Sequence, residues 1–131
     1  EIIKFCKTNP NSFYFKSLGS LNYLSCMKNS DLVIGNSSSG IIEAPSLRIP
    51  TINIGNRQEG RVKSSSIINI NHSQKKIYSA IKKCLTKAFK KKIKKISNPY
   101  FKKNTALKIT NIIKKKILNK KELVKRFHDI I

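Results

Sequence analysis

The hydrophobic pattern of the first half of the chain predicts short buried strands that alternate with helices. Asp31–Gly35, Pro50–Gly55 and Ser66–Ile70 are near-continuous apolar runs, which are typical of strands buried on both faces of a parallel sheet. Ser12–Lys16 is rich in aromatic residues and predicts a further short strand. Strands of this kind in alternation with helices indicate an α/β fold, with a Rossmann-like parallel sheet flanked by helices.

Helical patterns fill the intervals between these runs and dominate the second half. Apolar residues recur every three or four positions between Ile77 and Phe89, which predicts one long amphipathic helix that ends at Ser97-Asn-Pro-Tyr100. Asn104 or Thr105 would cap a following helix. The inward face of that helix is predicted to consist of Ile109, Ile112, Ile113 and Ile117. Shorter helices are predicted over Glu1–Lys7, Leu21–Met27, Ile41–Leu47 and Lys121–Ile131.

The most informative segment is the small-residue turn Asn36–Gly40, which follows a predicted strand and precedes a predicted helix. Small residues let a ligand approach the backbone closely, and a helix start offers unpaired N–H groups with a partial positive charge. The hydroxyls of Ser37 and Ser38 are able to add hydrogen bonds to phosphate oxygens. An ordinary polar turn with a serine N-cap accounts for the same residues, so the pattern leaves both interpretations open.

Three charged residues add weight to a site for a nucleotide diphosphate. Glu43 lies one helical turn beyond the serines, where its carboxylate is able to accept from both hydroxyls of a ribose. A glutamate that complements the helix dipole is the alternative interpretation. Arg57 and Arg61 follow the end of a strand, in a chain most of whose 28 basic residues are lysine. A planar bidentate donor suits a diphosphate, although chance placement on the surface also accounts for two arginines.

Composition and spacing argue against several other kinds of site. The sequence has no metal-ligand spacing, no paired carboxylates near Glu43 and no arrangement that suggests a nucleophile with its base. Neither a signal peptide nor a membrane-spanning run is visible. The three cysteines are too dispersed for a Cys-x-x-Cys motif and are predicted to be free thiols in a reducing compartment.

The charge of the chain is uneven. The formal net charge is +22 over 131 residues, a length that suits a single domain. Residues 73–131 hold 20 of the 28 Lys and Arg residues and only two of the six acidic residues. Aromatic residues do not alternate with these lysines and no nucleic-acid motif is recognised, so a solvated surface is favoured over a nucleic-acid surface.

Two motifs give the sequence a family resemblance. Gly35-Asn-Ser-Ser-Ser-Gly-Ile-Ile-Glu-Ala-Pro45 and Gly55-Asn-Arg-Gln-Glu-Gly-Arg61 resemble segments of the UDP-N-acetylglucosamine 2-epimerase family, most closely its hydrolysing branch. Asn98-Pro-Tyr100 is similar to a third family segment, although Phe101-Lys-Lys103 stands where glycines usually follow. The end of the chain, Phe127-His-Asp-Ile130, is similar to a family C-terminus.

By motif position, the resemblance implies a UDP site in this chain. Ser37 and Ser38 would hold the diphosphate, Glu43 would hold the ribose, and Arg57 would make a further contact with UDP. The backbone at Leu18 would lie against uracil. Secondary contacts would come from Ser39, Gly40 and Arg61.

The resemblance also implies a larger protein. The family places two Rossmann-like domains across a cleft, the glycosyltransferase-B arrangement, and residues 1–131 match the second domain. We therefore expect a C-terminal UDP-binding domain whose catalytic residues belong to a missing N-terminal domain, with a helix over residues 119–131 packing toward that domain. The full-length protein would be a cytoplasmic homo-oligomer without cofactor or metal.

The implied reaction releases UDP and an N-acetylmannosamine-type sugar for the synthesis of sialic or other nonulosonic acids. The alternatives are a non-hydrolysing epimerase or another glycosyltransferase-B enzyme that uses a UDP-sugar. From other classes, a basic nucleic-acid-binding module and an inactive remnant also stay open. The isolated chain is expected to bind UDP weakly and not to turn over substrate.

Overall fold

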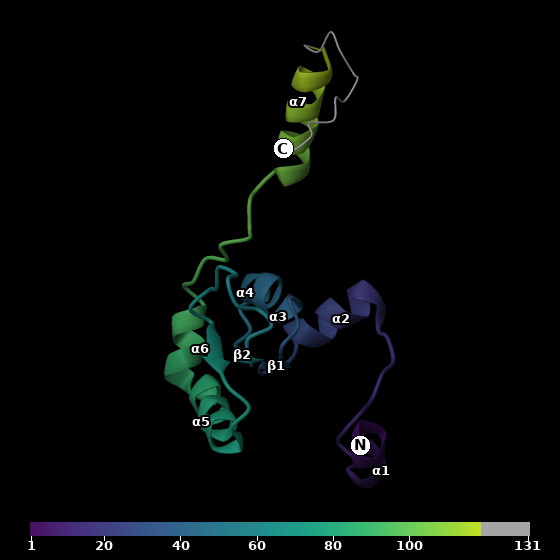
Figure 1. The fold of residues 1–131 in the computed structure, drawn as a ribbon, viewed down its shortest axis with the longest axis vertical. Coiled ribbons are helices and arrows are strands. Elements are labelled where there is room, and N and C mark those ends of the chain that lie inside the picture. The colour runs from purple at the N-terminus through teal and green to yellow at the C-terminus, as the bar shows by residue number, and fades with distance from the viewer. Residues whose placement is uncertain (119–131) are drawn as a thin grey trace, which may run out of the picture. The chain divides into compact units, whose positions relative to one another are not determined.

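A computed structural model describes residues 1–118 of the chain (Figure 1). Its sheet contains three parallel strands in the order β1 (Val33–Gly35), β2 (Thr51–Ile54) and β3 (Ile67–Ile70). All three strands lie within the apolar runs that predicted them. The predicted parallel α/β fold is confirmed.

Helices cover both faces of this sheet. A Cβ atom on Gly40 would meet Thr51 and Val33, so these two side chains face the helix that begins at Ser39. Successive residues of a strand point to opposite faces. Ile52 accordingly faces the other way, into a cluster with helical residues that include Cys84 and Phe89.

Seven helices are present among the described residues. The first four are α1 (Ile2–Thr8), α2 (Gly19–Lys28), α3 (Ser39–Ile42) and α4 (Ala44–Leu47). The others are α5 (Gln74–Leu85), α6 (Lys87–Ile93) and α7 (Thr105–Leu118). The α3 helix packs on β1 and β2, α5 packs on β2 and β3, and α2 contacts α4.

The predicted strand over Ser12–Lys16 is wrong, because this segment is neither strand nor helix. Phe13, Tyr14 and Phe15 are exposed by half or more of their surface. A strand is stabilised by hydrogen bonds to a neighbouring strand, and no described strand pairs with this segment. Aromatic content alone therefore does not produce a strand here.

The single long helix predicted after Ser73 is divided into α5 and α6 at Thr86. The backbone at Thr86 is extended, and its hydroxyl accepts a hydrogen bond from the backbone N–H of Phe89 at 3.2 Å. The same hydroxyl donates to the carbonyl of Lys83 at 2.8 Å. Thr86 thus caps the start of α6 and closes the end of α5. The predicted helix is interrupted there, although the spacing of the apolar residues continues across the break.

The helix predicted over Ile41–Leu47 begins earlier, at Ser39, and is divided at Glu43. Pro45 lies in the first turn of α4. A proline has no N–H to donate to the preceding turn, which accounts for the interruption. Glu43 thus occupies the junction of two four-residue helices.

The chain divides into two compact units, Glu1–Tyr100 and Phe101–Ile131. The described part of the second unit contains α7, whose isoleucines were predicted to point inward. They are instead exposed by half or more of their surface, because no other described element of that unit covers them: Ile109, Ile112, Ile113 and Ile117. The helices predicted over 121–131 and 119–131 lie outside the described residues.

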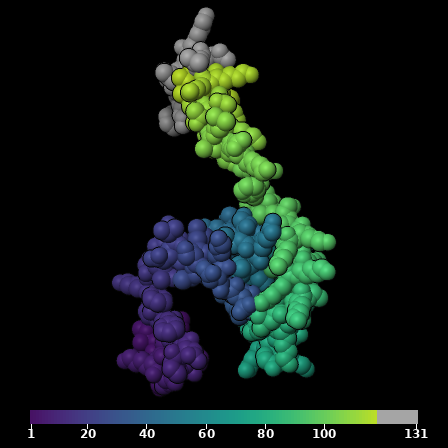
Figure 2. Space-filling model, turned by 180° about the vertical axis from the view of Figure 1, so that it is seen from behind, coloured from purple at the N-terminus to yellow at the C-terminus, as the bar shows by residue number. Residues whose placement is uncertain are grey.

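The lysine-rich segment that contains α5 and α6 forms a large part of the outer surface of the first unit (Figure 2, teal to green). Lys82 lies over the ring of Tyr78, with its Nζ atom 4.5 Å from the ring centroid. Asp31 pairs with Lys90 at 2.5 Å in an exposed ion pair. Within residues 1–118, no helix combines the length and the apolar character needed to cross a bilayer.

Candidate functional site

The serine turn lies where β1 ends. β1 ends at Gly35, which is in register with Asn53 of β2, so the segments that follow the two parallel strands leave the sheet at the same edge. The carboxyl ends of parallel strands are the usual place for ligand sites in open α/β sheets. The turn after β1 contains Ser37 and Ser38, and the loop after β2 contains Arg57 and Arg61.

One buried side chain joins this loop to the serine turn. The amide Nε2 of Gln58 donates to the backbone carbonyl of Asn36 at 2.9 Å, although the two residues are 22 positions apart. Gln58 is only 4% exposed. The loop is further shaped by a backbone hydrogen bond of 2.8 Å from Glu59 to Asn56. The loop that carries Arg57 is thereby attached to the serine turn.

The serines of the turn have different local roles. The hydroxyl oxygen of Ser37 accepts from the backbone N–H of Ser39 at 3.3 Å, which stabilises the turn. Ser38 occupies the N-cap position of α3, but its side chain makes no capping hydrogen bond. Because α3 contains only four residues, its helix dipole is small, and a phosphate here would depend on local N–H groups and hydroxyls.

Glu43 is half-buried at the junction of α3 and α4. The hydroxyl of Ser39 donates a short hydrogen bond to its carboxylate oxygen Oε2. This bond orients the carboxylate and occupies the Ser39 hydroxyl. Ser39, predicted as a secondary contact, is therefore seen here as a partner of Glu43.

Gly40 has a steric role in the packing of α3. An added Cβ atom would lie 2.8 Å from the Cγ2 atom of Thr51. Only glycine lets α3 approach the sheet this closely. This contact accounts for the glycine without a ligand, while its predicted secondary contact with UDP stays a prediction.

Asn98 forms hydrogen bonds to both short helices, which its place in the sequence did not indicate. Its Nδ2 atom donates to the carbonyl of Ile42 at 2.7 Å and to the hydroxyl of Ser46 at 2.6 Å. Its Oδ1 atom accepts from the backbone N–H of Tyr100 at 3.0 Å. The Asn98-Pro-Tyr100 segment is thereby attached to Ile42 of α3 and Ser46 of α4, on either side of Glu43.

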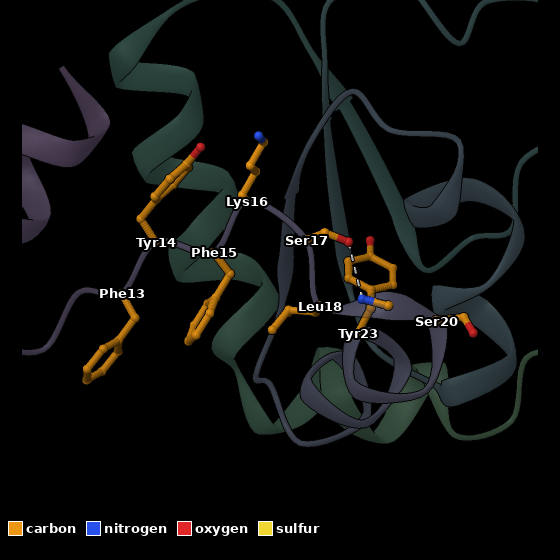
Figure 3. Close-up of a pocket in the computed structure, with 9 residues that line it drawn as sticks. Phe13, Tyr14, Phe15, Lys16, Ser17, Leu18, Ser20 and Tyr23 are labelled. Carbon is orange, nitrogen blue, oxygen red and sulfur yellow. Dashed lines mark hydrogen bonds between the residues drawn. The ribbon is translucent and has the colours of Figure 1, made fainter.

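Leu18 lines an open hollow of about 670 Å³ at the start of α2 (Figure 3). The hydroxyl of Ser17 accepts from the backbone N–H of Gly19 at 3.4 Å and closes the turn that presents Leu18. Aromatic rings make much of its lining: Phe13, Tyr14, Phe15 and Tyr23. The α2 helix, which begins at this hollow, contacts α4, and α4 begins directly after Glu43.

A second hollow, of about 440 Å³, lies where β2 and β3 end. His72 packs against Gly55, since an added Cβ atom on that glycine would lie 2.9 Å from the imidazole. Gly55 has a φ of +79°, a conformation that favours glycine.

The remaining titratable groups of the described residues suggest no other centre. Residues 1–118 contain no cluster of three or more His, Cys, Asp or Glu side chains that could hold a metal ion. Cys6, Cys26 and Cys84 are free thiols, of which Cys84 is buried. Burial raises the pKa of the Cys84 thiol, while the ammonium group of Lys83 acts in the opposite direction.

Comparison with known proteins places these residues in a family. A family model described as UDP-N-acetylglucosamine 2-epimerase matches residues 1–114. The polysialic acid biosynthesis protein P7 of Escherichia coli is 43% identical over 126 residues, which are 96% of this chain and 32% of that protein.

Two further relatives are named as hydrolysing enzymes. The GDP/UDP-N,N'-diacetylbacillosamine 2-epimerase (hydrolyzing) of Campylobacter jejuni is 48% identical over 53% of this chain and 18% of its own length. The UDP-N,N'-diacetylbacillosamine 2-epimerase (hydrolyzing) of Legionella pneumophila is 34% identical over 66% of this chain and 23% of its own length. The chain thus spans at most about a third of these relatives. It belongs to the UDP-N-acetylglucosamine 2-epimerase family.

Proposed function

We propose that this chain is the C-terminal, UDP-binding domain of a hydrolysing UDP-N-acetylglucosamine 2-epimerase. The observation that carries the proposal is the hydrogen bond from Gln58 to the carbonyl of Asn36. It joins the loop that contains Arg57 to the turn that contains Ser37 and Ser38, at the edge where parallel strands end. The hydroxyls and backbone N–H groups of the turn, together with a guanidinium from the attached loop, would suit a diphosphate.

The rest of the nucleotide would extend from this point along α3. Glu43 would accept hydrogen bonds from the two hydroxyls of the ribose, with its carboxylate oriented by Ser39. Leu18 would present its backbone to uracil at the open hollow of about 670 Å³ that it lines. Arg61 and Gly40 would contribute secondary contacts.

The chemical steps would need groups from outside these residues. In the proposed reaction, elimination of UDP from the UDP-sugar gives an unsaturated 2-acetamido sugar, and addition of water then gives the C2 epimer as a free sugar. This domain would hold the departing UDP, while the acid and base would come from an N-terminal domain of the longer protein. We propose that the whole protein is a cytoplasmic homo-oligomer.

Calorimetry on the 131-residue chain tests the UDP site. We expect weak binding of UDP and weaker binding of 2'-deoxy-UDP, because Glu43 loses one of its two ribose hydroxyls. Glu43→Ala should reduce the affinity for UDP about tenfold, the cost of removing a hydrogen-bonding charged group, and should abolish the difference between the two nucleotides. Glu59→Ala, in an exposed acid of the nearby loop, is the matched control.

Two results would contradict the proposed roles. If the wild-type chain does not bind UDP, this domain has no independent UDP site. If Glu43→Ala reduces the affinities for UDP and 2'-deoxy-UDP equally, Glu43 does not hold the ribose.

Arg57→Ala should weaken the binding of UDP and of inorganic pyrophosphate alike. It should leave the binding of uridine unaffected, because uridine has no phosphate for the guanidinium to contact.

The non-hydrolysing reaction is the second candidate, since a relative from Neisseria meningitidis, 38% identical over 62% of this chain, is named simply UDP-N-acetylglucosamine 2-epimerase. Product analysis with a protein that also contains the N-terminal domain separates the two. Free sugar with UDP supports hydrolysis. A UDP-sugar inverted at C2 supports the alternative.

A further inference from the structure

We infer that Gln58 is a positioning residue that couples the Arg57 loop to the serine turn, so that the contribution of Arg57 to UDP binding depends on Gln58. This inference rests on the proposed function and deepens it. Gln58 itself need not touch the ligand. Its amide reaches inward to the turn, while its sequence neighbours Arg57 and Glu59 are exposed.

The burial of Gln58 distinguishes it from the rest of its loop. Asn56, Arg57, Glu59 and Gly60 are exposed, whereas Gln58 is 4% exposed. A buried amide is costly unless its polar atoms form hydrogen bonds. Nε2 has a partner in the carbonyl of Asn36, while Oε1 is buried and has no partner among the described residues.

The carbonyl of Asn36 is an effective point of attachment because it immediately precedes Ser37. A displacement of this peptide moves the N–H group of Ser37 directly. It also moves the hydroxyl of Ser37, which accepts from the N–H of Ser39. The Gln58 side chain therefore acts on both the loop and the turn.

Gln58→Met is the sharpest test, since methionine has similar length and volume but cannot donate to the carbonyl of Asn36. In the wild-type background, Arg57→Ala should weaken UDP binding about tenfold. In the Gln58→Met background, the same change should cost about twofold or less, because the loop no longer holds Arg57 in place. Val62→Ala, in an exposed residue shortly after the loop, should leave the full effect of Arg57→Ala intact.

A second measurement does not require UDP. In two-dimensional amide NMR spectra of the free 131-residue chain, Gln58→Met should shift the signals of Ser37, Ser38 and Ser39, and Val62→Ala should not. Gln58→Asn, which keeps an amide but shortens its reach by one methylene, provides the same comparison if Gln58→Met does not fold.

The outcomes separate this inference from the proposed function. Unchanged serine signals in the Gln58 variants would overturn the coupling, whether or not UDP binds. An undiminished effect of Arg57→Ala in the Gln58→Met background would also overturn it while leaving the UDP site in place. If wild type does not bind UDP but the serine signals shift, the proposed function fails together with the dependence of UDP binding on Gln58, and only the structural coupling of loop and turn stands.

Discussion

Gly40 sets the distance between α3 and the sheet, and its effect on stability is open to a direct test. We expect Gly40→Ala to lower the free energy of unfolding by about 1–3 kcal/mol, because the added methyl would lie 2.8 Å from the Cγ2 atom of Thr51. Thr51→Ser removes that Cγ2 atom and should recover part of the loss in the double variant. Urea unfolding of both single variants and the double variant measures this coupling.

Thr51→Ser alone is the control for that experiment. It removes a buried methyl and should cost about 1 kcal/mol by itself. If Gly40→Ala is equally destabilising with threonine or serine at position 51, the close approach of α3 to β2 is not the reason for the glycine.

Cys84 provides a pH-dependent prediction at the scale of one residue. Burial raises the pKa of its thiol above the ordinary value, so the folded protein holds this proton to higher pH than the unfolded chain does. The stability contributed by the neutral thiol is complete below the unfolded pKa of about 8.5 and is lost as the pH rises above it. The free energy of unfolding should therefore fall more steeply above about pH 8.5 in wild type than in Cys84→Ala.

Cys26→Ala, which removes an exposed thiol, should retain the wild-type slope with pH. The comparison concerns slopes and not absolute stabilities, since Cys84→Ala also leaves a small cavity in the core. Equal slopes for wild type and Cys84→Ala would show that this thiol does not titrate differently on folding.

At the scale of the single residue, the sequence indicated candidate side chains for a site but not the contacts that hold them in place. Glu43 and the serines stood out by type and position. The sequence could not show that Ser39 binds Glu43, because this depends on where α3 ends. The sequence indicated no role for Gln58, since nothing in a linear pattern reveals that one amide of an exposed loop is buried.

At the scale of elements, Thr86 marks the boundary between α5 and α6. Thr86→Ala should cost about 1 kcal/mol of stability, because the backbone N–H of Phe89 loses its cap. Thr86→Ser retains the hydroxyl and should cost much less. Thermal unfolding followed by circular dichroism at 222 nm measures the difference.

Thr110→Ala, within α7, is a suitable comparison because the Thr110 hydroxyl bonds to a carbonyl of its own helix. It should change the stability little, since alanine is the better helix former. If Thr86→Ala is as mild as Thr110→Ala, the interruption between α5 and α6 does not depend on the cap.

The elements differ in how far a pattern could predict them. β1, β2 and β3 lie where continuous apolar runs predicted strands. The expected burial on both faces holds for β2 alone, because Ile34 of β1 and Asn69 of β3 are exposed. The strand predicted at Ser12–Lys16 is absent because a strand needs a neighbouring strand to pair with, and the sequence does not reveal whether one is available. The break at Thr86 and the exposure of the α7 isoleucines were not predicted. Apolar periodicity shows which side of a helix is apolar, but it does not show where the helix is interrupted or which element covers that side.

At the scale of the whole molecule, the charge of +22 is expected to oppose folding. Like charges repel over about 10 Å or more at low ionic strength, and added salt screens this repulsion. Among the described residues, Lys90 and Asp31 form the single ion pair between side chains, so little attraction is lost on screening. Raising NaCl from about 20 mM to about 200 mM should therefore raise the melting temperature by several degrees.

A charge-reversal variant tests whether repulsion among the lysines causes the expected effect of salt on the melting temperature. No acidic residue lies in the first turn of α5, and Lys75 is exposed there. Lys75→Glu removes repulsion and complements the helix dipole, and should stabilise the protein by about 0.5–1 kcal/mol at low salt and by less at high salt. Sucrose at matched osmolality is the uncharged control, since it stabilises by exclusion from the surface and should preserve the advantage of Lys75→Glu. A melting temperature that is independent of salt, together with a Lys75→Glu advantage that survives in high salt, would mean that repulsion among the lysines does not limit the stability of this fold.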